Sequence, residues 1–417
     1  MEQVCIIGCG VVGLTSALFL QQAGVDVLLV DSKGVANKCS AGNAGHFATE
    51  QVFPLAHPSL LLKLPQMLLN PLGPLHIRTT YLLQALPWFR RFLQNMSKNK
   101  RISNHLAISS LNHSSIASWQ KLLHSMQLTE YISYQGALLV TEQQKMTALQ
   151  EQYSCYRNAG IDVSWIDSSK LSAMEPDLAE HLTAALDFTE VAHTPNPFAL
   201  CQQLFQKYIS QGGRFKQLQV KTIIYDKRSI KLLSEQDDIV TNKVIIAAGA
   251  YSAELTQQLG WKVPLESERG YHLMLKGVGL QRPVSSLERK CIMTPMQFGL
   301  RVAGTVEFSG LKSAPSYKRA QILQQHADKL LRTPTSPASY GEPVPGSLQH
   351  AWAGDRPSLP DSLPVIGACP NMGGVYFNFG HQHLGLTQAA FSAELITDCI
   401  LGRTPAINLH PFRINRF

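Results

Sequence analysis

Three glycines and one acidic residue near the amino terminus have the types and spacing that bind a dinucleotide. Gly8, Gly10 and Gly13 form a G-x-G-x-x-G pattern, and Asp31 follows Gly13 by eighteen residues. In this pattern the first glycine permits a sharp turn, the second lets backbone N–H groups approach a pyrophosphate, and the third lets a helix pack closely on a strand. A carboxylate at this spacing accepts hydrogen bonds from both ribose hydroxyls and disfavours a 2′-phosphate. The pattern predicts a dinucleotide site that does not take NADP.

The elements around these residues have the order that such a site needs. Apolar β-formers from Val4 to Ile7 precede the turn, a helical apolar stretch runs to Ala23, and a second apolar strand covers 25–30. The helix offers its unpaired N–H groups and its partial positive charge to the phosphates. One alternative is an ordinary βαβ unit whose glycines only shape a turn. Another is a signal peptide, but acidic Glu2 and the lack of a basic leading segment argue against it.

Composition limits the class of protein. The chain of 417 residues is long enough for two domains, and 45% of its residues are hydrophobic. No uninterrupted apolar run reaches the roughly 18 residues that a membrane-spanning helix needs, which predicts a soluble or peripheral protein. The eight cysteines form no C-x-x-C pair. This argues against a zinc site and a disulfide framework, so we expect no metal and a cytoplasmic location.

Part of the excess positive charge is concentrated in one region of the sequence. The net charge is +8. Two apolar stretches, 58–75 and 81–93, are interrupted by prolines that we expect to divide them into short pieces. Basic residues overlap and follow the second stretch: Arg90, Arg91, Lys98, Lys100 and Arg101. Apolar segments with basic flanks suit a membrane surface, here the inner face of the cytoplasmic membrane. The alternative is a set of short core helices with a solvated basic end.

Helix and strand signals alternate along the rest of the chain. Helical spacing covers about 78–150 and contains a strand at 136–140, and a helix then a strand follow within 194–220. The segment 264–345 is predicted to be rich in strands, and a last helix covers about 386–401. This interleaving predicts two discontinuous domains formed from one chain.

Three later motifs add to the glycine turn. VIIAAG (244–249) ends an apolar strand on a glycine, and WAGDRPSLPDSLPVIG (352–367) combines an Arg-Pro bend with a terminal glycine. GHQHLGLTQAAFSAEL (380–395) places glycines and a threonine at the start of a helix. A helix amino terminus stabilises a ring that develops negative charge, as a reduced flavin does. A capped helix that needs no ligand is the alternative for this last motif.

These motifs, together with SAGNAGHF (40–47), LRVAGTVEFSG (300–310) and LGRTPAI (401–407), resemble the FAD-dependent D-amino acid oxidoreductase superfamily. The likeness is strongest to bacterial D-amino acid dehydrogenases and related imino-acid dehydrogenases. It implies an α/β (α+β) fold in which a Rossmann-like FAD-binding domain is interleaved with a mostly antiparallel β-sheet substrate domain. The FAD-binding domain would comprise 1–77, 191–263 and 346–417, and the substrate domain 78–190 and 264–345.

The resemblance also implies which residues hold a non-covalent FAD. A branch of the superfamily tethers its flavin through a cysteine, but the counterpart here falls near Gly354. The implied cofactor residues are Gly8, Gly10, Val11, Val12, Gly13, Asp31, Ser32, Ser40, Gly42, Asn43, Ala44, Gly45, His46, Phe47, Val220, Ala248, Gly249, Gly354, Arg356, Gly380, His381, Leu384, Gly385, Leu386 and Thr387.

The expected chemistry places four residues near the substrate. Hydride moves directly from the substrate to the flavin, so positioning matters more than a strong base. Arg301 is the expected carboxylate anchor, because a guanidinium binds a carboxylate through two parallel hydrogen bonds; its alternative is a surface salt bridge. Tyr271 and His272 border the substrate in relatives, or serve only in packing. His46, like His381, would be a neutral imidazole near the flavin ring.

The implied reaction is oxidation of a D-amino acid or an imino acid, such as a D-proline derivative, to the imine. We expect the electrons to pass to a quinone or another carrier rather than to oxygen. His46 and Glu50 stand where alanine-preferring dehydrogenases have a different sequence, which leaves the substrate open. The alternatives are an oxidase or dehydrogenase of glycine, sarcosine or an opine-like N-substituted amino acid, a flavin-dependent tRNA-modification domain, and a non-catalytic FAD-binding protein. No basic stripe interleaved with aromatic residues is evident, so we expect no nucleic-acid partner.

Overall fold

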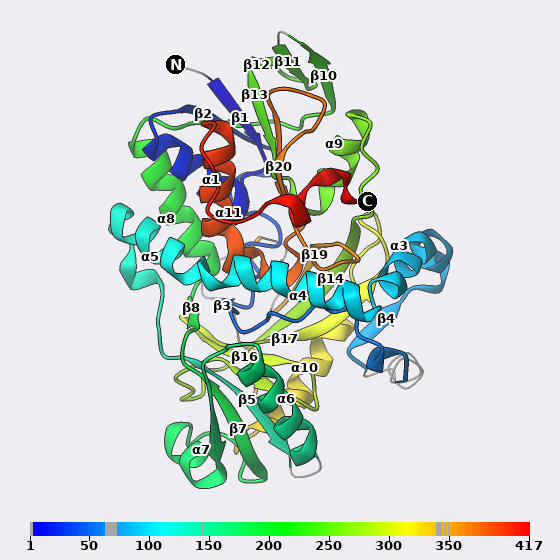
Figure 1. Cartoon of the computed structure of the whole chain (residues 1–417). Helices are drawn as coiled ribbons and strands as arrows, with labels where there is room; N and C mark the ends of the chain where they lie inside the picture. The colour runs from blue at the N-terminus through cyan, green and yellow to red at the C-terminus, as the bar shows by residue number, and fades with distance from the viewer. Residues whose placement is uncertain are drawn as a thin grey trace.

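The computed structural model describes residues 3–62, 73–142, 145–227, 229–338, 344–345, 347–348 and 350–417. A six-stranded sheet occupies the upper half of the molecule in Figure 1 and a ten-stranded sheet the lower half. Three helices run across the middle: α3 (Leu82–Gln94), α4 (Lys98–His113) and α5 (Ser115–Met126). The predicted mixed α/β class is confirmed.

The six-stranded sheet contains the predicted βαβ unit. Its strands in spatial order are β20 (Val365–Ala368), β21 (Val375–Phe379), β13 (Lys243–Ile246), β1 (Gln3–Ile7), β2 (Asp26–Asp31) and β9 (Arg214–Gln217). Neighbouring strands pair in parallel except β20 and β21. The apolar runs in the central strands fit a parallel sheet that is buried on both faces.

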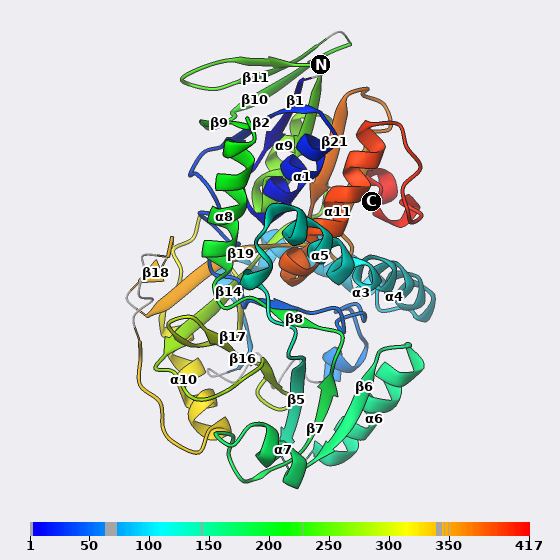
Figure 2. The same cartoon turned by 90° about the vertical axis from the view of Figure 1, so that its left-hand side faces the viewer.

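Helices cover one face of this sheet and a small sheet covers the other. On the first face lie α1 (Val11–Gln22), α8 (Pro197–Ser210) and α11 (Gly385–Ile400), with α5 beside them (Figure 2). The second face packs against β10 (Thr222–Asp226), β11 (Ser229–Leu233), β12 (Ile239–Thr241) and α9 (Ser252–Gln258). Asn196 starts α8, because its side chain accepts a hydrogen bond from the Ala199 amide.

The ten-stranded sheet is mostly antiparallel, and only β5–β15 and β4–β17 pair in parallel. Its spatial order is β18 (Ser347–Leu348), β19 (Ala351–Ser358), β14 (Glu266–Leu275), β17 (Gly299–Phe308), β16 (Ile292–Met296), β15 (Val284–Ser286), β5 (Ala137–Glu142), β7 (Leu182–Phe188) and β6 (Val163–Asp167), with β4 (Leu75–Ile77) on β17. Helix α10 (Lys318–Leu330) packs on one face, where Leu323 contacts the cluster that contains Leu273 and Val302.

The remaining elements are short or peripheral. Helix α6 (Met146–Asn158) packs against β7, and α7 (Ser168–Met174) follows β6. A two-stranded ladder joins β3 (His46–Phe47) to β8 (Ala192–His193). The 3-10 helices are η1 (Thr79–Tyr81), η2 (Thr129–Tyr131), η4 (Gly249–Tyr251), η5 (Gln382–Leu384), η6 (His410–Phe412) and η7 (Ile414–Arg416).

Three details differ from the sequence-based expectations. The segment 264–345 contains helix α10 among its strands. Strand β19 hydrogen-bonds to β14 and β4 to β17, although the predicted boundaries group both with the FAD-binding segments. Pro87 lies inside α3 and does not end it, so the expected division of 81–93 into short pieces is wrong. Most of the apolar stretch 58–75, with Pro65 and Pro71, lies outside the described residues.

Candidate functional site

The glycine turn between β1 and α1 leaves no room for side chains. Gly8 has a φ of +114°, and a Cβ added there would overlap the Ala247 carbonyl oxygen. A Cβ added to Gly13 would overlap the Gly8 carbonyl oxygen, so Gly13 sets the close approach of α1 to the strand. Gly10 is less crowded, with Ser40 Oγ 3.2 Å from the place that a Cβ would take. The strand, turn and helix therefore meet as a dinucleotide requires.

Polar groups around the turn match the two ends of an adenosine diphosphate. The Val11 amide at the start of α1 donates to Ser40 Oγ at 2.9 Å. Val12 and Gly13 follow in the first turn of α1. The N–H groups of a first helical turn have no acceptor within the helix and can bind phosphate. Asp31, followed by Ser32, ends β2, and its carboxylate accepts from the Cys9 amide at 2.8 Å and the Lys33 amide at 2.7 Å. The donors and the carboxylate fit the pyrophosphate and ribose of FAD.

A second glycine, Gly249, follows the strand next to β1. Ala248 and Gly249 come directly after β13, which pairs with β1. Gly249 has a φ of +55°, and a Cβ added there would meet no heavy atom within 4 Å. Val220 lies in the loop between β9 and β10 and packs against the core on that face of the sheet. These three residues lie beyond the carboxyl ends of β13 and β9, and open α/β sheets bind ligands at the carboxyl ends of their strands.

The segment 42–50, here called the flavin loop, connects the two sheets. His272 Nδ1 lies 2.9 Å from the Gly42 carbonyl oxygen, and Arg301 donates to the Asn43 carbonyl oxygen. Ala44 follows, and the Thr194 amide donates to the Gly45 carbonyl at 2.7 Å. At the other end of the loop, the Ala48 amide donates to Thr387 Oγ1 at 2.9 Å. The flavin loop is therefore fixed between β17 and the start of α11.

Trp352 forms an aromatic wall beside the flavin loop. Its ring lies directly against Gly42 and Gly354. A Cβ atom added to either glycine would overlap the ring, so neither position can carry a side chain. The indole also stacks on His272 with ring centres 5.1 Å apart and an angle of 14°. Burial and the charge of Arg301 lower the pKa of His272 well below 6.5, so this ring is neutral. The wall excludes water from this side of the loop.

Arg301 is a buried cation on β17. Its residue is 4% exposed, which excludes the surface salt bridge considered from the sequence. It lines a small cavity of about 10 Å³ together with Asn196, Met274, Met296 and Phe298. Thr294 pairs with Arg301 in the ladder, and its buried hydroxyl has no partner among the described residues. A carboxylate bound here would meet a charged fork in apolar surroundings.

Tyr271 lies on the other face of β14. Its hydroxyl donates to Glu307 and accepts from the Ser316 amide at 3.0 Å, within the cluster that packs on α10. Successive residues of a strand point to opposite faces, so His272 reaches the flavin loop and Tyr271 does not. These contacts agree with the alternative that Tyr271 serves in packing, on the face of the sheet opposite to the flavin loop.

His46 does not have the neutral ring expected from the sequence. Its Nδ1 lies 3.3 Å from the Ala192 carbonyl oxygen and its Nε2 3.0 Å from Glu50 Oε1. Both neighbours are acceptors, so both ring nitrogens carry a proton. Burial lowers the pKa of His46, but the charge and hydrogen bond of Glu50, with the Ala192 carbonyl, raise it overall above 6.5. Below this raised pKa, His46 is an imidazolium paired with Glu50.

We expect this pair to make stability depend on pH. A pKa raised by folding contributes stability below the unfolded value of 6.5, and this contribution is lost as the pH rises through the folded value. The difference in melting temperature between the wild type and Glu50→Gln should be largest near pH 6 and shrink toward pH 9. Differential scanning fluorimetry measures it, and a difference that stays constant with pH would show that His46 is not charged.

The carboxyl-terminal motifs meet the flavin loop at the start of α11. Gly380 has a φ of +86°, and Leu384, Gly385, Leu386 and Thr387 form the turn and first residues of the helix. Arg356, on β19, lies 3.5 Å from Glu268 and against Gly270. Burial lowers the pKa of His381 to about 3, so its ring is neutral as expected. Its Nε2 is buried without a partner among the described residues.

Two residues that the sequence did not identify as site residues join this arrangement. His193 pairs directly with His46 in the β3–β8 ladder, next to Phe47, which packs edge-on against Trp119. Burial and the His46 charge lower the pKa of His193 to about 4. Thr294 is the second, and it pairs with Arg301 between strands β16 and β17. Neither His193 nor Thr294 belongs to a sequence motif, so the sequence contains no signal that identifies them as site residues.

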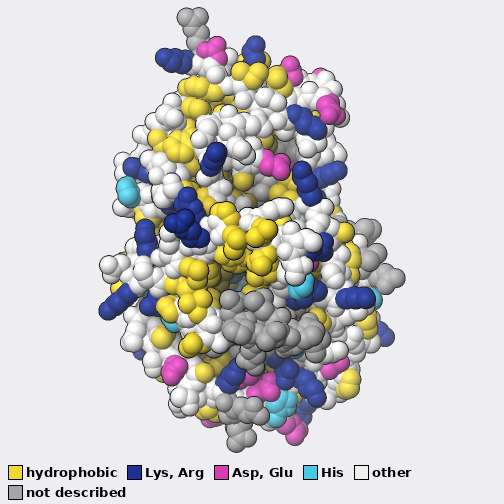
Figure 3. Space-filling model, turned by 90° about the vertical axis from the view of Figure 1, so that its right-hand side faces the viewer, with side chains coloured by type: hydrophobic (Ala, Val, Ile, Leu, Met, Phe, Trp, Pro, Cys, Tyr) yellow, Lys and Arg dark blue, Asp and Glu magenta, His cyan; other side chains and the backbone are white. Residues whose placement is uncertain are grey.

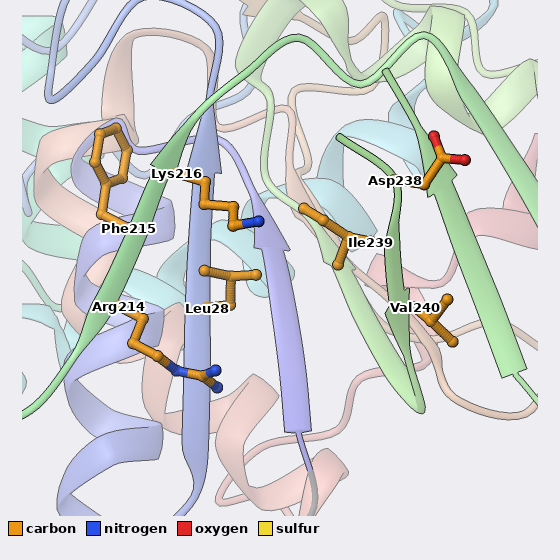
Figure 4. Close-up of a pocket in the computed structure, with 7 residues that line it drawn as sticks. All are labelled: Leu28, Arg214, Phe215, Lys216, Asp238, Ile239 and Val240. Carbon is orange, nitrogen blue, oxygen red and sulfur yellow. The ribbon is translucent and has the colours of Figure 1, made fainter. Parts of the chain in front are cut away.

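A larger cleft lies elsewhere and includes none of the predicted site residues. It encloses about 470 Å³ between β9 and β12, beside Leu28 (Figure 4). The two cations on its rim are already paired, Arg214 with Asp26 at 2.6 Å and Lys216 with Asp237 at 3.1 Å.

Among the described residues no cluster of three or more His, Cys, Asp or Glu could hold a metal ion. In the same part of the chain, no helix is both long and apolar enough to cross a membrane.

Known proteins share the whole of this architecture. The DAO family, described as FAD dependent oxidoreductase, matches residues 3–399. A D-amino-acid oxidase from Bradyrhizobium diazoefficiens is 30% identical and covers 100% of this chain and 99% of its own, and a D-amino acid dehydrogenase from Vibrio cholerae is 28% identical over 98% and 97%. Glycine oxidase from Geobacillus kaustophilus has the same fold, with a TM-score of 0.78 at 19% identity over 100% of both chains. The chain therefore belongs to the DAO family of FAD-dependent oxidoreductases.

Proposed function

We propose that the protein oxidises the Cα–N bond of a D-amino acid or imino acid, with Arg301 as the carboxylate anchor. The buried cation at the small cavity beside the flavin loop is the observation that carries this proposal. A planar guanidinium holds a carboxylate through two parallel hydrogen bonds and so fixes the neighbouring Cα. The names of the Bradyrhizobium and Vibrio relatives support the substrate class.

The proposed reaction converts an amine to an imine. The Cα–H leaves with two electrons, the nitrogen loses a proton, and water then converts the imine to a 2-oxo acid and ammonia. FAD, when bound, accepts the hydride equivalent. The glycine turn, Ser40 and Asp31 would hold its adenosine diphosphate half, and the flavin loop, Trp352 and the start of α11 would surround its ring. Neutral His272 and Trp352, which are buried and stacked, would keep water away from this side of the flavin loop.

We also propose that one sheet binds FAD and the other binds the substrate. The six-stranded sheet and its helices form the FAD-binding unit, since they contain the glycine turn, Asp31 and α11. The ten-stranded sheet forms the substrate unit, since it contributes Arg301 and Trp352. Because β19 pairs with β14, we assign β19 to the substrate unit and propose a boundary near residue 359 instead of 346.

Anaerobic flavin bleaching tests the reaction. The holoenzyme is mixed with D-amino acids, D-proline, L-amino acids, glycine and sarcosine, and loss of the oxidised flavin absorbance is followed. D-amino or imino acids should bleach the flavin fastest. Faster bleaching by glycine or sarcosine would favour the alternative substrate class, and no bleaching by any amine would contradict the proposal.

A surface on α3 and α4 suggests how electrons leave the protein. Leu83 is 79% exposed and Leu106 is 62% exposed. Further leucines and isoleucines of this surface are Leu82, Leu86, Leu93 and Ile102. Arg90, Arg91, Lys98 and Lys100 are exposed beside them, and Figure 3 shows apolar and basic side chains gathered on this side. We propose that this surface binds the inner face of the cytoplasmic membrane, where a quinone accepts the electrons.

Vesicle binding tests this membrane surface. The double variant Leu83→Ser, Leu86→Ser should bind vesicles that contain phosphatidylglycerol about 10-fold more weakly than the wild type, because two leucines no longer enter the interface. Co-sedimentation measures the binding. The matched control is Ile224→Ser, Val240→Ser, which removes two exposed apolar residues from the small sheet. Equal binding by all three proteins, or rapid peroxide formation without a quinone, would contradict this part of the proposal.

A further inference from the structure

One side chain of α4 holds the end of the flavin loop. Asn112 is 1% exposed, and its Nδ2 donates to the Thr49 carbonyl at 3.2 Å and to the Gln51 carbonyl at 3.1 Å. The Ala48 carbonyl oxygen lies 3.5 Å from the same nitrogen. Residues 48–53 lie in neither a helix nor a strand, so their carbonyls lack the regular partners that such elements supply. Asn112 supplies donors to this backbone from a rigid helix.

His105 binds the same stretch of backbone from the same helix. Its Nδ1 lies 2.9 Å from the Val52 carbonyl oxygen, so this nitrogen carries the proton and donates it. Its ring also stacks on Phe53, with ring centres 5.0 Å apart. His105 and Asn112 are seven residues apart, which is close to two turns of an α-helix, so they lie on one side of α4. This side of α4 therefore holds the backbone from 48 to 53.

The same side of α4 also reaches the start of α11. Gln388, in the first turn of α11, is 1% exposed and donates to Asn112 Oδ1 at 2.9 Å. Ile108 of α4 packs in one cluster with Ala48 of the flavin loop and Leu384 of the turn before α11. The amide of Asn112 thus connects the two segments that would flank the flavin ring.

The flavin loop is held at two places. Its first residues are fixed to the ten-stranded sheet, where His272 and Arg301 bind its first two carbonyls. Its last residues are fixed to α4 by Asn112 and to α11 by Thr387. Releasing one of these places lets the loop move relative to the other, and reactions between bound groups are sensitive to displacements of about 1 Å.

We propose that Asn112 is a positioning residue for oxidation of the substrate, an inference that rests on the proposed function. Asn112 acts through the flavin loop: its amide fixes the end of the loop relative to the start of α11. This keeps the flavin ring aligned with a substrate whose carboxylate is bound by Arg301.

Asn112→Asp tests the proposal, because it keeps the shape and the acceptor for Gln388 and removes the amide donor. The rate constant of flavin reduction at saturating substrate should fall by about 10- to 100-fold, since the reacting groups are displaced. The Kd of butanoate, a carboxylate without an α-nitrogen, should change by less than about 2-fold, because Arg301 stays in β17. Anaerobic stopped-flow absorbance measures the rate constant and isothermal titration calorimetry the Kd.

Two further measurements on Asn112→Asp do not depend on turnover. The circular dichroism of the bound flavin in the visible range should differ from that of the wild type, because the loop beside the ring has moved. The Kd of FAD should rise by about 10-fold, since the hydrogen bonds that hold one flanking segment are lost.

Asn104→Asp is the matched control. Asn104 is also a buried asparagine of α4, at 5% exposure, but its Nδ2 donates to Asn95 Oδ1 at 3.1 Å, at the end of α3. Its variant should keep the wild-type flavin spectrum and should change the reduction rate by less than about 2-fold. Melting temperatures identify any variant that fails to fold.

His105→Phe is a milder variant that decides the question if Asn112→Asp does not fold. It keeps a ring to stack on Phe53 and loses one donor at a half-buried position, so the reduction rate should fall by about 3- to 10-fold. Wild-type reduction rates and flavin spectra in both Asn112→Asp and His105→Phe would overturn the inference, as would an equal loss in folded Asn104→Asp. Absence of bleaching by every amine contradicts only the proposed function, because the flavin spectrum and the Kd of FAD still report the position of the loop.

Discussion

Replacing Arg301 with alanine is expected to raise KM for the best amino acid substrate by about 10²- to 10⁴-fold, because two charge-assisted hydrogen bonds to the carboxylate are lost. FAD should stay bound, since the glycine turn and Asp31 lie on the other sheet. Steady-state kinetics and the flavin absorbance of the purified variant measure the two effects. The change in kcat should be smaller than the change in KM if the arginine acts chiefly in binding.

Two further variants make this result interpretable. Arg301→Lys keeps a positive charge without the planar fork, so it should recover only part of the affinity. Arg289→Ala removes an arginine that pairs with Glu142 at 2.8 Å at the far end of the same sheet, and it should leave KM unchanged. An Arg301→Ala enzyme with wild-type KM would exclude Arg301 from the substrate site.

Gly13→Ala should give the largest loss of stability among single methyl additions at the cofactor site. The new Cβ would overlap the Gly8 carbonyl oxygen, a backbone atom that cannot rotate away. Helix α1 must then move from β1, which we expect to cost about 3 kcal/mol of unfolding free energy and to weaken FAD binding. Chemical denaturation and the ratio of flavin to protein after gel filtration measure both effects.

Gly373→Ala is the control for this substitution. A Cβ there meets no heavy atom within 4 Å and the backbone has no positive φ, so stability and FAD content should match the wild type. Normal FAD content in Gly13→Ala would show that the helix tolerates displacement and that the third glycine is not needed for the site.

Local patterns predicted much of the fold. The first βαβ unit is encoded by residues that touch one another, from the apolar strand Gln3–Ile7 to Asp31, and its boundaries agree closely with the structure. The final helix, expected at about 386–401, spans Gly385–Ile400. Helix α10 was missed because the neighbouring strand signals dominated the interpretation of 264–345. Its own apolar residues, such as Ala320, Leu323 and Ala327, do recur at helical spacing and pack on the sheet.

The substrate side was less predictable, because it depends on contacts between distant segments. Tyr271 and His272 are adjacent in sequence, yet only the pairing of β14 with β17 and β19 decides which of them faces the flavin loop. The charge of His46 depends on two acceptors, one of which is the carbonyl of Ala192, 146 residues away. The sequence can identify both histidines as candidates but cannot assign these partners.

The order of strands in the six-stranded sheet has a consequence for synthesis of the protein. Strand β13 pairs with β1 on one side and with β21 on the other, and α11 packs on α1, where Thr15 donates to the Ala389 carbonyl at 3.0 Å. The amino-terminal turn therefore lacks its neighbouring strand β13 until residue 246 has left the ribosome, and its covering helix α11 until residue 400 has done so. Until then the nascent chain presents an unpaired strand edge, the kind of surface that chaperones protect and that aggregates when exposed. We therefore expect FAD to bind only after nearly the whole polypeptide has been synthesised.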